Sequence, residues 1–335
     1  MNTTSKTSIY KGITPAALIA VIVMPMVLPS TTLATEILIF ALAALGCNLL
    51  LGYTGLLSFG QGIFFGGGAY AASLSMIHLN FGLLSALLCA MIVGALLAAL
   101  VGALAIRRTG IYFVMLTLAF SQMAYFLAYT LSDWTGGDNG LLDVPRPAVE
   151  IFGIHLADLT SSQAFYGFVA ALFMLIFIFA RRVIHSPFGS TLVAIRENEG
   201  RASAIGFSTS HFKLLAFVIS GAITGIAGAL YAMLLNFAPL SNIELMMSEN
   251  ILIMTIIGGT GSLLGSLLGA GTIVMLGDIL SSIWPRWMII LGIALIAVVL
   301  FMPAGLWGGI ESLMKRFRES KTSQTDPKLQ QEAKS

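Results

Sequence analysis

Charged side chains are scarce in this chain of 335 residues. Only 10% of the residues are Asp, Glu, Lys or Arg, 57% are hydrophobic, and the mean hydropathy is +0.93. Soluble domains average about 25% charged residues, so a chain this apolar cannot cover its surface with polar groups in water. The net charge of +2 indicates neither a nucleic-acid nor an acidic partner. The composition excludes a soluble protein and predicts an integral membrane protein.

Groups suited to catalysis or metal binding are equally scarce. Both cysteines, Cys47 and Cys89, lie inside apolar runs, where a cysteine behaves as a small hydrophobic residue. The four histidines show no metal-ligand spacing. No glycine-rich stretch has the spacing of a phosphate-binding loop, and none is followed by Lys and Ser or Thr. We therefore expect no catalytic residue, metal or cofactor, and any ATP must be hydrolysed by another subunit.

Long apolar runs occupy most of the sequence. About 20 apolar residues cross a bilayer as a helix, and this criterion predicts an all-α membrane protein with about ten transmembrane helices. The candidate runs are Ile13–Leu28, Leu33–Leu51, Leu56–Ile77, Leu83–Ile106, Ile111–Leu131, Ala164–Ala180, Leu214–Phe237, Ile251–Leu268, Leu268–Ile283 and Trp287–Met302. The stretch Gly258–Gly271 is compatible with two helices or with one span and a re-entrant segment.

The positions of Lys and Arg in the short loops predict the orientation. Segment 1–12, loop 183–211 and tail 311–335 are basic and are assigned to the cytoplasm, as are Arg107 and Arg108. Loop 132–162 carries five acidic residues against one arginine and is assigned to the outside, together with Glu244 and Glu249. The membrane domain then covers 13–310, and both termini are cytoplasmic.

A glycine-rich stretch, Asn48–Ser73, is expected to break or bend, because glycine weakens a helix by about 1 kcal/mol relative to alanine. Broken helices bind or pass substrate in many transporters. Close packing through small residues is the alternative for most of the glycines. The candidate pathway residues in this stretch are Gly55, Ser58, Gly60, Gln61 and Gly62.

Two further patterns have both a functional and a structural interpretation, and a third favours a structural one. A polar stripe on Ile111–Leu131 predicts either a pathway or interhelical hydrogen bonds; it comprises Thr117, Ser121, Gln122, Tyr125 and Tyr129. The turn sequence TGGDNG predicts either a surface turn or a contact with an external partner; the residues concerned are Thr135, Gly136, Gly137, Asn139 and Gly140. Glycines repeat at every fourth residue, which favours close helix packing; they are Gly261, Gly265 and Gly269.

The stretch SPFGSTLVAIRENEGRASAIG, Ser186–Gly206, is too polar to insert and predicts a cytoplasmic helix. Ser186 can cap it, Pro187 suits its first turn and Gly206 can end it. A solvated connector is the ordinary interpretation of such mixed charge. A transporter without its own ATP site also needs a contact with an external motor, and a tethered helix suits that role. The candidate coupling residues are Ala194, Arg196, Glu197, Asn198, Glu199 and Gly206.

Several of these blocks, taken in order, resemble the permeases of branched-chain amino acid ABC importers. They are NLLLGYTGLLSFGQGIFFGGGAY, RTGIYFVMLTLAF, TGGDNGL, the Ser186–Gly206 stretch and KLLAFVISGAITGIAGALYA, spread over about Thr31 to Met302. Within them, Ala194–Glu199 is similar to the region through which this family contacts its ATPases. Gly200 departs from the family pattern and is expected to weaken or bend the coupling helix.

The resemblance implies a permease subunit in the bacterial inner membrane, of the type with a long external loop. The implied partners are a second permease, which the family leads us to expect to be a different paralogue, two cytoplasmic ATPases and an external substrate-binding protein. A related permease for urea or short amides is an alternative. An ion-coupled secondary transporter is another, although its spans would need more ionisable residues than Asp278.

Overall fold

The computed structural model describes residues 3–146, 149–151, 154–157, 159, 161–283 and 305–312, with single residues or pairs between 286 and 300. Its helices are α1 (Thr3–Val27), α2 (Thr31–Thr54), α3 (Gln61–Leu79), α4 (Leu83–Ala105), α5 (Ile111–Thr130), α6 (Ser132–Thr135), α7 (Ser162–Ile184), α8 (Pro187–Glu197), α9 (Glu199–Ala204), α10 (Thr209–Leu235), α11 (Leu245–Gly258) and α12 (Leu263–Ile283). The structure also contains two 3₁₀ turns, η1 (Gly137–Asn139) and η2 (Leu240–Asn242), and two strands, β1 (Val149–Ile151) and β2 (Ile154–Ala157). Residues 305–312 are helical as well.

Seven of the described helices are long and apolar enough to cross a membrane, which makes this a multi-pass membrane protein. They are α2, α3, α4, α5, α7, α10 and α12. The six predicted runs that correspond to α2–α5, α7 and α10 agree with these helices to within five residues at each end. Two apolar helical segments, Thr14–Val27 and α11, are shorter. The predicted span Trp287–Met302 lies largely outside the described residues.

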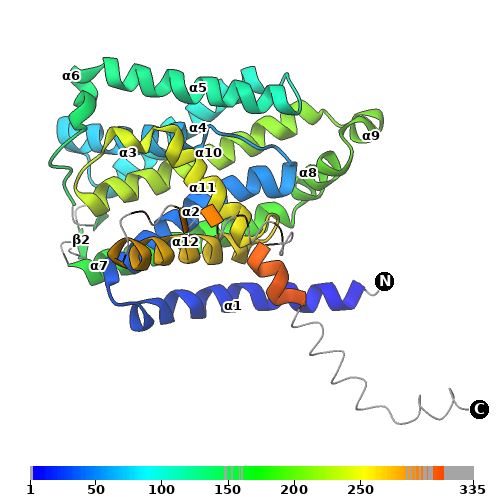
Figure 1. The fold of residues 1–335 in the computed structure, drawn as a ribbon, viewed down its shortest axis with the longest axis horizontal. Coiled ribbons are helices and arrows are strands. Elements are labelled where there is room, and N and C mark those ends of the chain that lie inside the picture. Colours follow the sequence, from blue (N-terminus) through cyan, green and yellow to red (C-terminus); the bar gives the residue numbers. More distant parts are fainter. Residues whose placement is uncertain are drawn as a thin grey trace, which may run out of the picture.

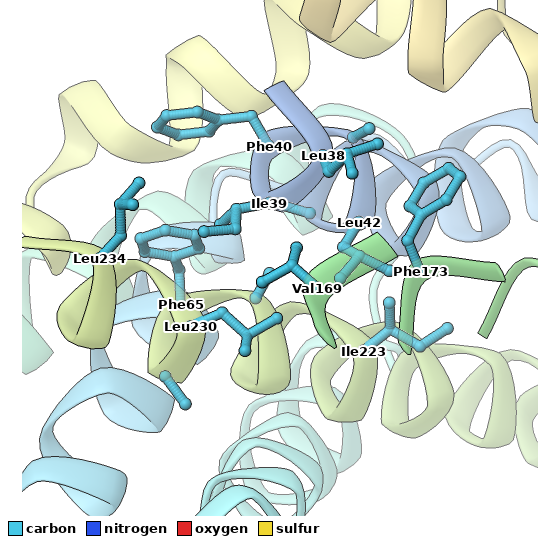
Figure 2. Packing of buried hydrophobic residues seen from close by; sticks show 14 of the residues in the cluster. Leu38, Ile39, Phe40, Leu42, Phe65, Val169, Phe173, Ile223, Leu230 and Leu234 are labelled. Atoms are coloured by element: carbon cyan, nitrogen blue, oxygen red, sulfur yellow. The ribbon is translucent and has the colours of Figure 1, made fainter. Parts of the chain in front are cut away.

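Helix α2 forms the centre of the bundle. Its first turn is capped by Ser30, whose hydroxyl accepts from the Thr32 backbone N–H at 3.1 Å. Most of its side chains are buried on all sides, against α3, α7, α10, α11 and α12. Figure 2 shows this packing, with side chains from α2, α3, α7 and α10 around one apolar centre: Leu38, Ile39, Phe40, Leu42, Phe65, Val169, Phe173, Ile223, Leu230 and Leu234. A helix that is apolar all round is expected in such a position.

The predicted boundary between two spans at Leu268 is wrong, because α12 runs through that residue without interruption. The chain instead leaves helical geometry between α11 and α12, where Gly259 and Gly261 have φ values of 117° and 85° that side-chain-bearing residues rarely adopt. The predicted close packing is confirmed for two of the three glycines. A Cβ on Gly265 or Gly269 would lie within 2.7 Å of the α11 backbone, whereas Gly261 belongs to the turn.

The elements divide between two ends of the bundle (Figure 1). Helices α8 and α9 lie at one end, called the α8 end, and α6 and the β1–β2 hairpin lie at the other, called the α6 end. The predicted external loop contains the antiparallel hairpin of β1 and β2, in which Ile151 pairs with Ile154.

Candidate functional site

The predicted coupling helix Ser186–Gly206 is two helices rather than one. Pro187 occupies the first turn of α8 as predicted, but the Ser186 hydroxyl donates to the Val183 carbonyl at 2.6 Å instead of capping the helix. The helix is interrupted at Asn198, where φ is −159° and ψ is 100°. The Asn198 side chain then accepts a hydrogen bond from the Arg201 N–H at 2.9 Å and caps the start of α9. Gly200 lies inside α9, so the break precedes the residue expected to bend the helix.

The predicted coupling residues differ in what they contact. Ala194, Glu197, Asn198 and Gly206 are exposed at the α8 end. Glu199 instead forms an ion pair with Lys213 of α10, with 2.5 Å between carboxylate oxygen and Nζ. The Lys213 side chain is only 5% exposed and that of Glu199 is 38% exposed. This partly buried ion pair therefore connects α9 to the N-terminal part of α10.

Arg196 is exposed as well, but its guanidinium contacts the end of α2. Its guanidinium donates from Nη1 to the backbone carbonyl of Gly52, in the last turn of α2. A Cβ on Gly55 would lie 3.1 Å from the Arg196 Cγ, so the glycine leaves room for the arginine stem. A cation is favourable at a helix C-terminus, where carbonyl groups lack helical partners. Arg196 thus joins α8 to the end of α2.

A second buried contact ties the same end of α2 to the turn between α11 and α12. The fully buried Asn48 amide donates to the Ser262 carbonyl at 2.7 Å and to the Ser266 hydroxyl at 3.0 Å, and it accepts from the Gly261 N–H at 2.8 Å. One turn and a half later, Tyr53 donates to the Gly261 carbonyl at 2.8 Å. Asn48 was not among the predicted site residues, although an amide inside an apolar span is a signal for a buried polar contact.

The predicted break in the glycine-rich stretch is confirmed. Helix α2 ends at Gly55, with φ of 74°, and residues 55–60 are not helical. Ser58 is buried in this segment and accepts from the Gly60 N–H at 3.1 Å. The Phe59 N–H donates to Thr117 of α5 at 3.2 Å. Both of these backbone N–H groups have a partner within the chain, as a non-helical segment inside a membrane requires.

Gln61 is fully buried at the start of α3 and joins three helices. Its amide donates to the Ser220 hydroxyl at 3.1 Å and accepts from the Thr224 hydroxyl at 2.9 Å, both on α10. Ser220 in turn donates to the Gly46 carbonyl of α2 at 2.7 Å. The next residue, Gly62, donates its N–H to Ser248 of α11 at 2.7 Å. These contacts give Gln61 a packing function; a direct contact with a passing substrate stays a prediction.

The predicted polar stripe on α5 does not form a single face. Thr117 and Ser121 are buried, and the Ser121 hydroxyl has no hydrogen-bond partner among the described residues. Gln122 and Tyr129 are exposed on other sides of the helix, and Tyr125 is half-buried. At 3.6 residues per turn the five positions spread over about 140°, and only Thr117 and Ser121, at one edge of that arc, are buried.

The TGGDNG turn is folded onto the chain rather than free. Thr135 donates to the Ala128 carbonyl at 2.6 Å, and Gly136, Gly137 and Gly140 all have positive φ. The following Leu141 pairs with Ala238 as an antiparallel bridge. Asp138 and Asn139 remain exposed at the tip.

Arg146, the basic exception in the acidic loop, has a structural explanation. Its guanidinium donates to the Met233 carbonyl at 2.6 Å and also to the Leu234 carbonyl, in the last turn of α10. It also lies over the Phe165 ring, 5.3 Å from the centroid. The C-terminal end of a helix favours a cation at this position, because the cation is attracted to the helix dipole and donates hydrogen bonds to the free carbonyl groups.

Comparison with known proteins agrees with the resemblance. A family model described as the permease component of branched-chain amino acid transport systems matches residues 30–300. The high-affinity branched-chain amino acid permease LivM of Salmonella typhimurium is 29% identical over 297 residues, which cover 83% of this chain and 69% of the relative. LivM of Escherichia coli K12 is 28% identical over 313 residues, covering 87% and 73% respectively.

The high-affinity branched-chain amino acid permease LivH of Escherichia coli K12 is also similar, at 29% identity over 292 residues that cover 80% of this chain and 91% of the relative. No solved structure matches the chain. Because the family model covers most of the sequence, this chain belongs to the family of permease components of branched-chain amino acid ABC transport systems, and it is a non-catalytic subunit.

Proposed function

We propose that this chain forms, together with a second and different permease subunit, the membrane passage of an importer for branched-chain or other hydrophobic amino acids. Two cytoplasmic ATPases drive it and an external binding protein delivers the substrate. The similarity to both LivM and LivH supports a paired permease, because both names describe parts of branched-chain amino acid transport systems. The proposed location is the bacterial inner membrane.

The proposed orientation puts the α8 end in the cytoplasm and the α6 end outside, with both termini cytoplasmic and about ten crossings in all. The distribution of charge supports it. The connection between α4 and α5, which carries Arg107 and Arg108, lies at the same end as α8 and α9, which also carry arginines, whereas the loop after α5 is acidic (Figure 1). Basic residues favour the cytoplasmic side of a membrane. Asp138 and Asn139, exposed at the tip of the TGGDNG turn, then face the binding protein.

In the proposed coupling mechanism, the exposed residues of α8 contact an ATPase, and Arg196 transmits the motion. The contact of Arg196 with the Gly52 carbonyl is the observation that carries this proposal, because it joins the candidate coupling helix to the central helix. ATP binding draws the two ATPases together, α8 displaces the end of α2, and the passage opens to the outside. The non-helical segment 55–60 acts as the joint next to this contact. ATP hydrolysis resets the passage.

The test uses the complete transporter in proteoliposomes, with uptake of radiolabelled leucine and ATP hydrolysis as readouts. Glu197 is exposed on α8, so Glu197→Lys reverses a charge at the proposed contact without removing a described hydrogen bond or ion pair. Like charges at an interface cost several kcal/mol, so uptake is expected to fall by about tenfold or more. Asp143→Lys, the same change on the exposed loop at the α6 end, is the control. Normal uptake and normal ATP hydrolysis in Glu197→Lys would remove α8 from the mechanism.

A second measurement tests the orientation itself. Asn198 is exposed, and a cysteine placed there is expected to react with a membrane-impermeant thiol reagent only after the cells are opened. The two natural cysteines are replaced first, so that the reagent can label only the introduced one. Cys47 is buried, but Cys89 is partly exposed and could react. Labelling of Asn198→Cys in sealed cells would reverse the orientation and exclude import driven from the α8 end.

A further inference from the structure

Helix α11 begins near the middle of the bundle rather than at its α6 end. Gly62, in the first turn of α3, donates to Ser248 of α11. Gln61, the preceding residue, bonds to Ser220 and Thr224, which lie midway along the 27-residue helix α10. Segment 236–244 therefore returns from the end of α10 into the bundle before α11 starts. Figure 1 shows α11 crossing the centre of the molecule.

This position changes the meaning of Glu249. Its sequence neighbours suggested a residue of an outer loop, but it follows Ser248 and so lies close to mid-depth. The other side of α11, which includes Ser248, Ile251 and Thr255, is buried against α2, α3 and α12. Glu249 itself is exposed, and none of the residues that the structure describes forms an ion pair or hydrogen bond with its carboxylate.

Four residues spaced by three and four form one face of α11 that points away from the chain. These residues, together called the α11 open face, are Met246, Glu249, Asn250 and Ile253; the first is 61% exposed, the next two are exposed and the last is half-buried. A carboxylate facing lipid at this depth costs about 3 kcal/mol on insertion scales. Ionisable residues in spans therefore face protein or a water-filled cavity, so the open face borders either the passage or a neighbouring subunit, and not the lipid.

The chemistry of the open face matches one class of ligand. Along this face a carboxylate and an amide occupy consecutive positions, with a thioether three residues before the carboxylate and an aliphatic side chain four residues after it. A zwitterionic amino acid presents an ammonium group, a carboxylate and, in the branched-chain case, an aliphatic side chain. A lysine or arginine from the second permease would need only the carboxylate, whereas the zwitterion uses the whole arrangement.

We propose that Glu249 binds the ammonium group of the amino acid as it crosses the passage, with Asn250 donating to its carboxylate and Met246 and Ile253 contacting its side chain. This inference rests on the proposed function and deepens it, because it assigns a substrate contact within the permease. The residues first predicted for that contact, Ser58 and Gln61, form hydrogen bonds within the chain, and their contact with a substrate stays a prediction.

The test compares Glu249→Gln, Glu249→Asp and a control in the complete transporter, reconstituted with its second permease, its ATPases and leucine-loaded binding protein. Glu249→Gln keeps the shape of the side chain and removes its charge. The control is Asp143→Asn, the same chemical change on an exposed carboxylate in the loop after α5. The readouts are leucine uptake, ATP hydrolysis stimulated by the loaded binding protein, and co-purification of the second permease.

Loss of one charge-assisted hydrogen bond corresponds to about a tenfold or greater loss of affinity for the bound group. We therefore expect leucine uptake by Glu249→Gln to fall by about tenfold or more. Uptake by Asp143→Asn stays at the wild-type level and Glu249→Asp recovers part of the loss. Stimulated ATP hydrolysis and co-purification are unchanged in all three.

Two results would overturn the inference alone. Wild-type uptake by Glu249→Gln would show that the carboxylate does not contact the substrate. Loss of the second permease during purification of Glu249→Gln would assign the carboxylate to an ion pair between subunits. A different result overturns the proposed function as well: wild-type vesicles that hydrolyse ATP but accumulate no leucine, before any variant is compared.

Discussion

The contact between α3 and α10 provides a quantitative test of the packing. Gly228 of α10 lies against the backbone of α3, and a Cβ placed there would be 1.8 Å from the Phe65 carbonyl oxygen and 2.6 Å from its carbon. To regain an ordinary van der Waals separation, the α3 backbone would have to retreat by roughly 1.5 Å. That retreat would also loosen the neighbouring contact of Gly68 with Gly225. Gly228→Ala is therefore an overpacking mutation inside a helix–helix interface.

The magnitude follows from two opposing effects. Overpacking a close contact costs about 1–3 kcal/mol, and this contact belongs at the upper end because a backbone atom rather than a flexible side chain is in the way. Alanine recovers about 1 kcal/mol of helix propensity. We expect the free energy of unfolding of Gly228→Ala to fall by about 2 kcal/mol.

Gly167 supplies the matched control. It lies within α7, and a Cβ there would meet nothing within 4 Å. Gly167→Ala keeps the propensity gain without the clash, so its unfolding free energy should equal or exceed that of the wild type by up to about 1 kcal/mol. Both variants are measured by reversible denaturation in mixed micelles. Equal stabilities of the two variants would refute the close approach of α3 and α10.

Three other variants test further contacts. Gln61→Leu removes both amide bonds to α10 and should lower the unfolding free energy by about 1–3 kcal/mol in the same assay; wild-type stability would contradict the bonds. Glu199→Gln leaves the buried Lys213 without its counter-charge and should cost about 1–3 kcal/mol, whereas the exposed Glu197→Gln should cost nothing measurable; equal thermal stability of the two would count against the ion pair. Gly140→Ala combines positive φ with a Cβ 2.5 Å from the Ala238 carbonyl oxygen and should make the loop more sensitive to protease; Gly110→Ala, with positive φ but open space, is its control.

The spans and the family could be predicted because each depends on local sequence. A run of apolar residues determines a membrane helix wherever its neighbours lie. The break at Gly55 and the close packing of Gly265 were also readable, since glycine allows positive φ and close backbone approach whatever surrounds it. The helical interruption at Asn198 had a readable signal as well, because asparagine favours the N-cap position that it occupies.

The direction and depth of polar side chains could not be predicted, because they depend on which helices become neighbours. Gln61 was a candidate for the pathway by its polarity alone, and only the position of Ser220 and Thr224 shows that it bonds within the chain. Glu249 was assigned to an outer loop because it lies between the predicted spans Leu214–Phe237 and Ile251–Leu268. Its depth is set by the contact of Ser248 with Gly62, two residues 186 positions apart in the sequence.

Helix α2 is the element through which the two candidate sites are connected. Its last turn accepts from Arg196 of α8, and Asn48, one turn earlier, holds the turn between α11 and α12 through three hydrogen bonds. In the proposed mechanism, a displacement of α8 would reach α11, which carries the open face, through these two polar contacts of α2. Coupling over a distance needs such a contiguous element with two arrangements. Because residues 55–60 are not helical, α2 can shift at that end without carrying α3 with it, which makes α2, rather than the glycine-rich stretch as a whole, the moving part of the proposed mechanism.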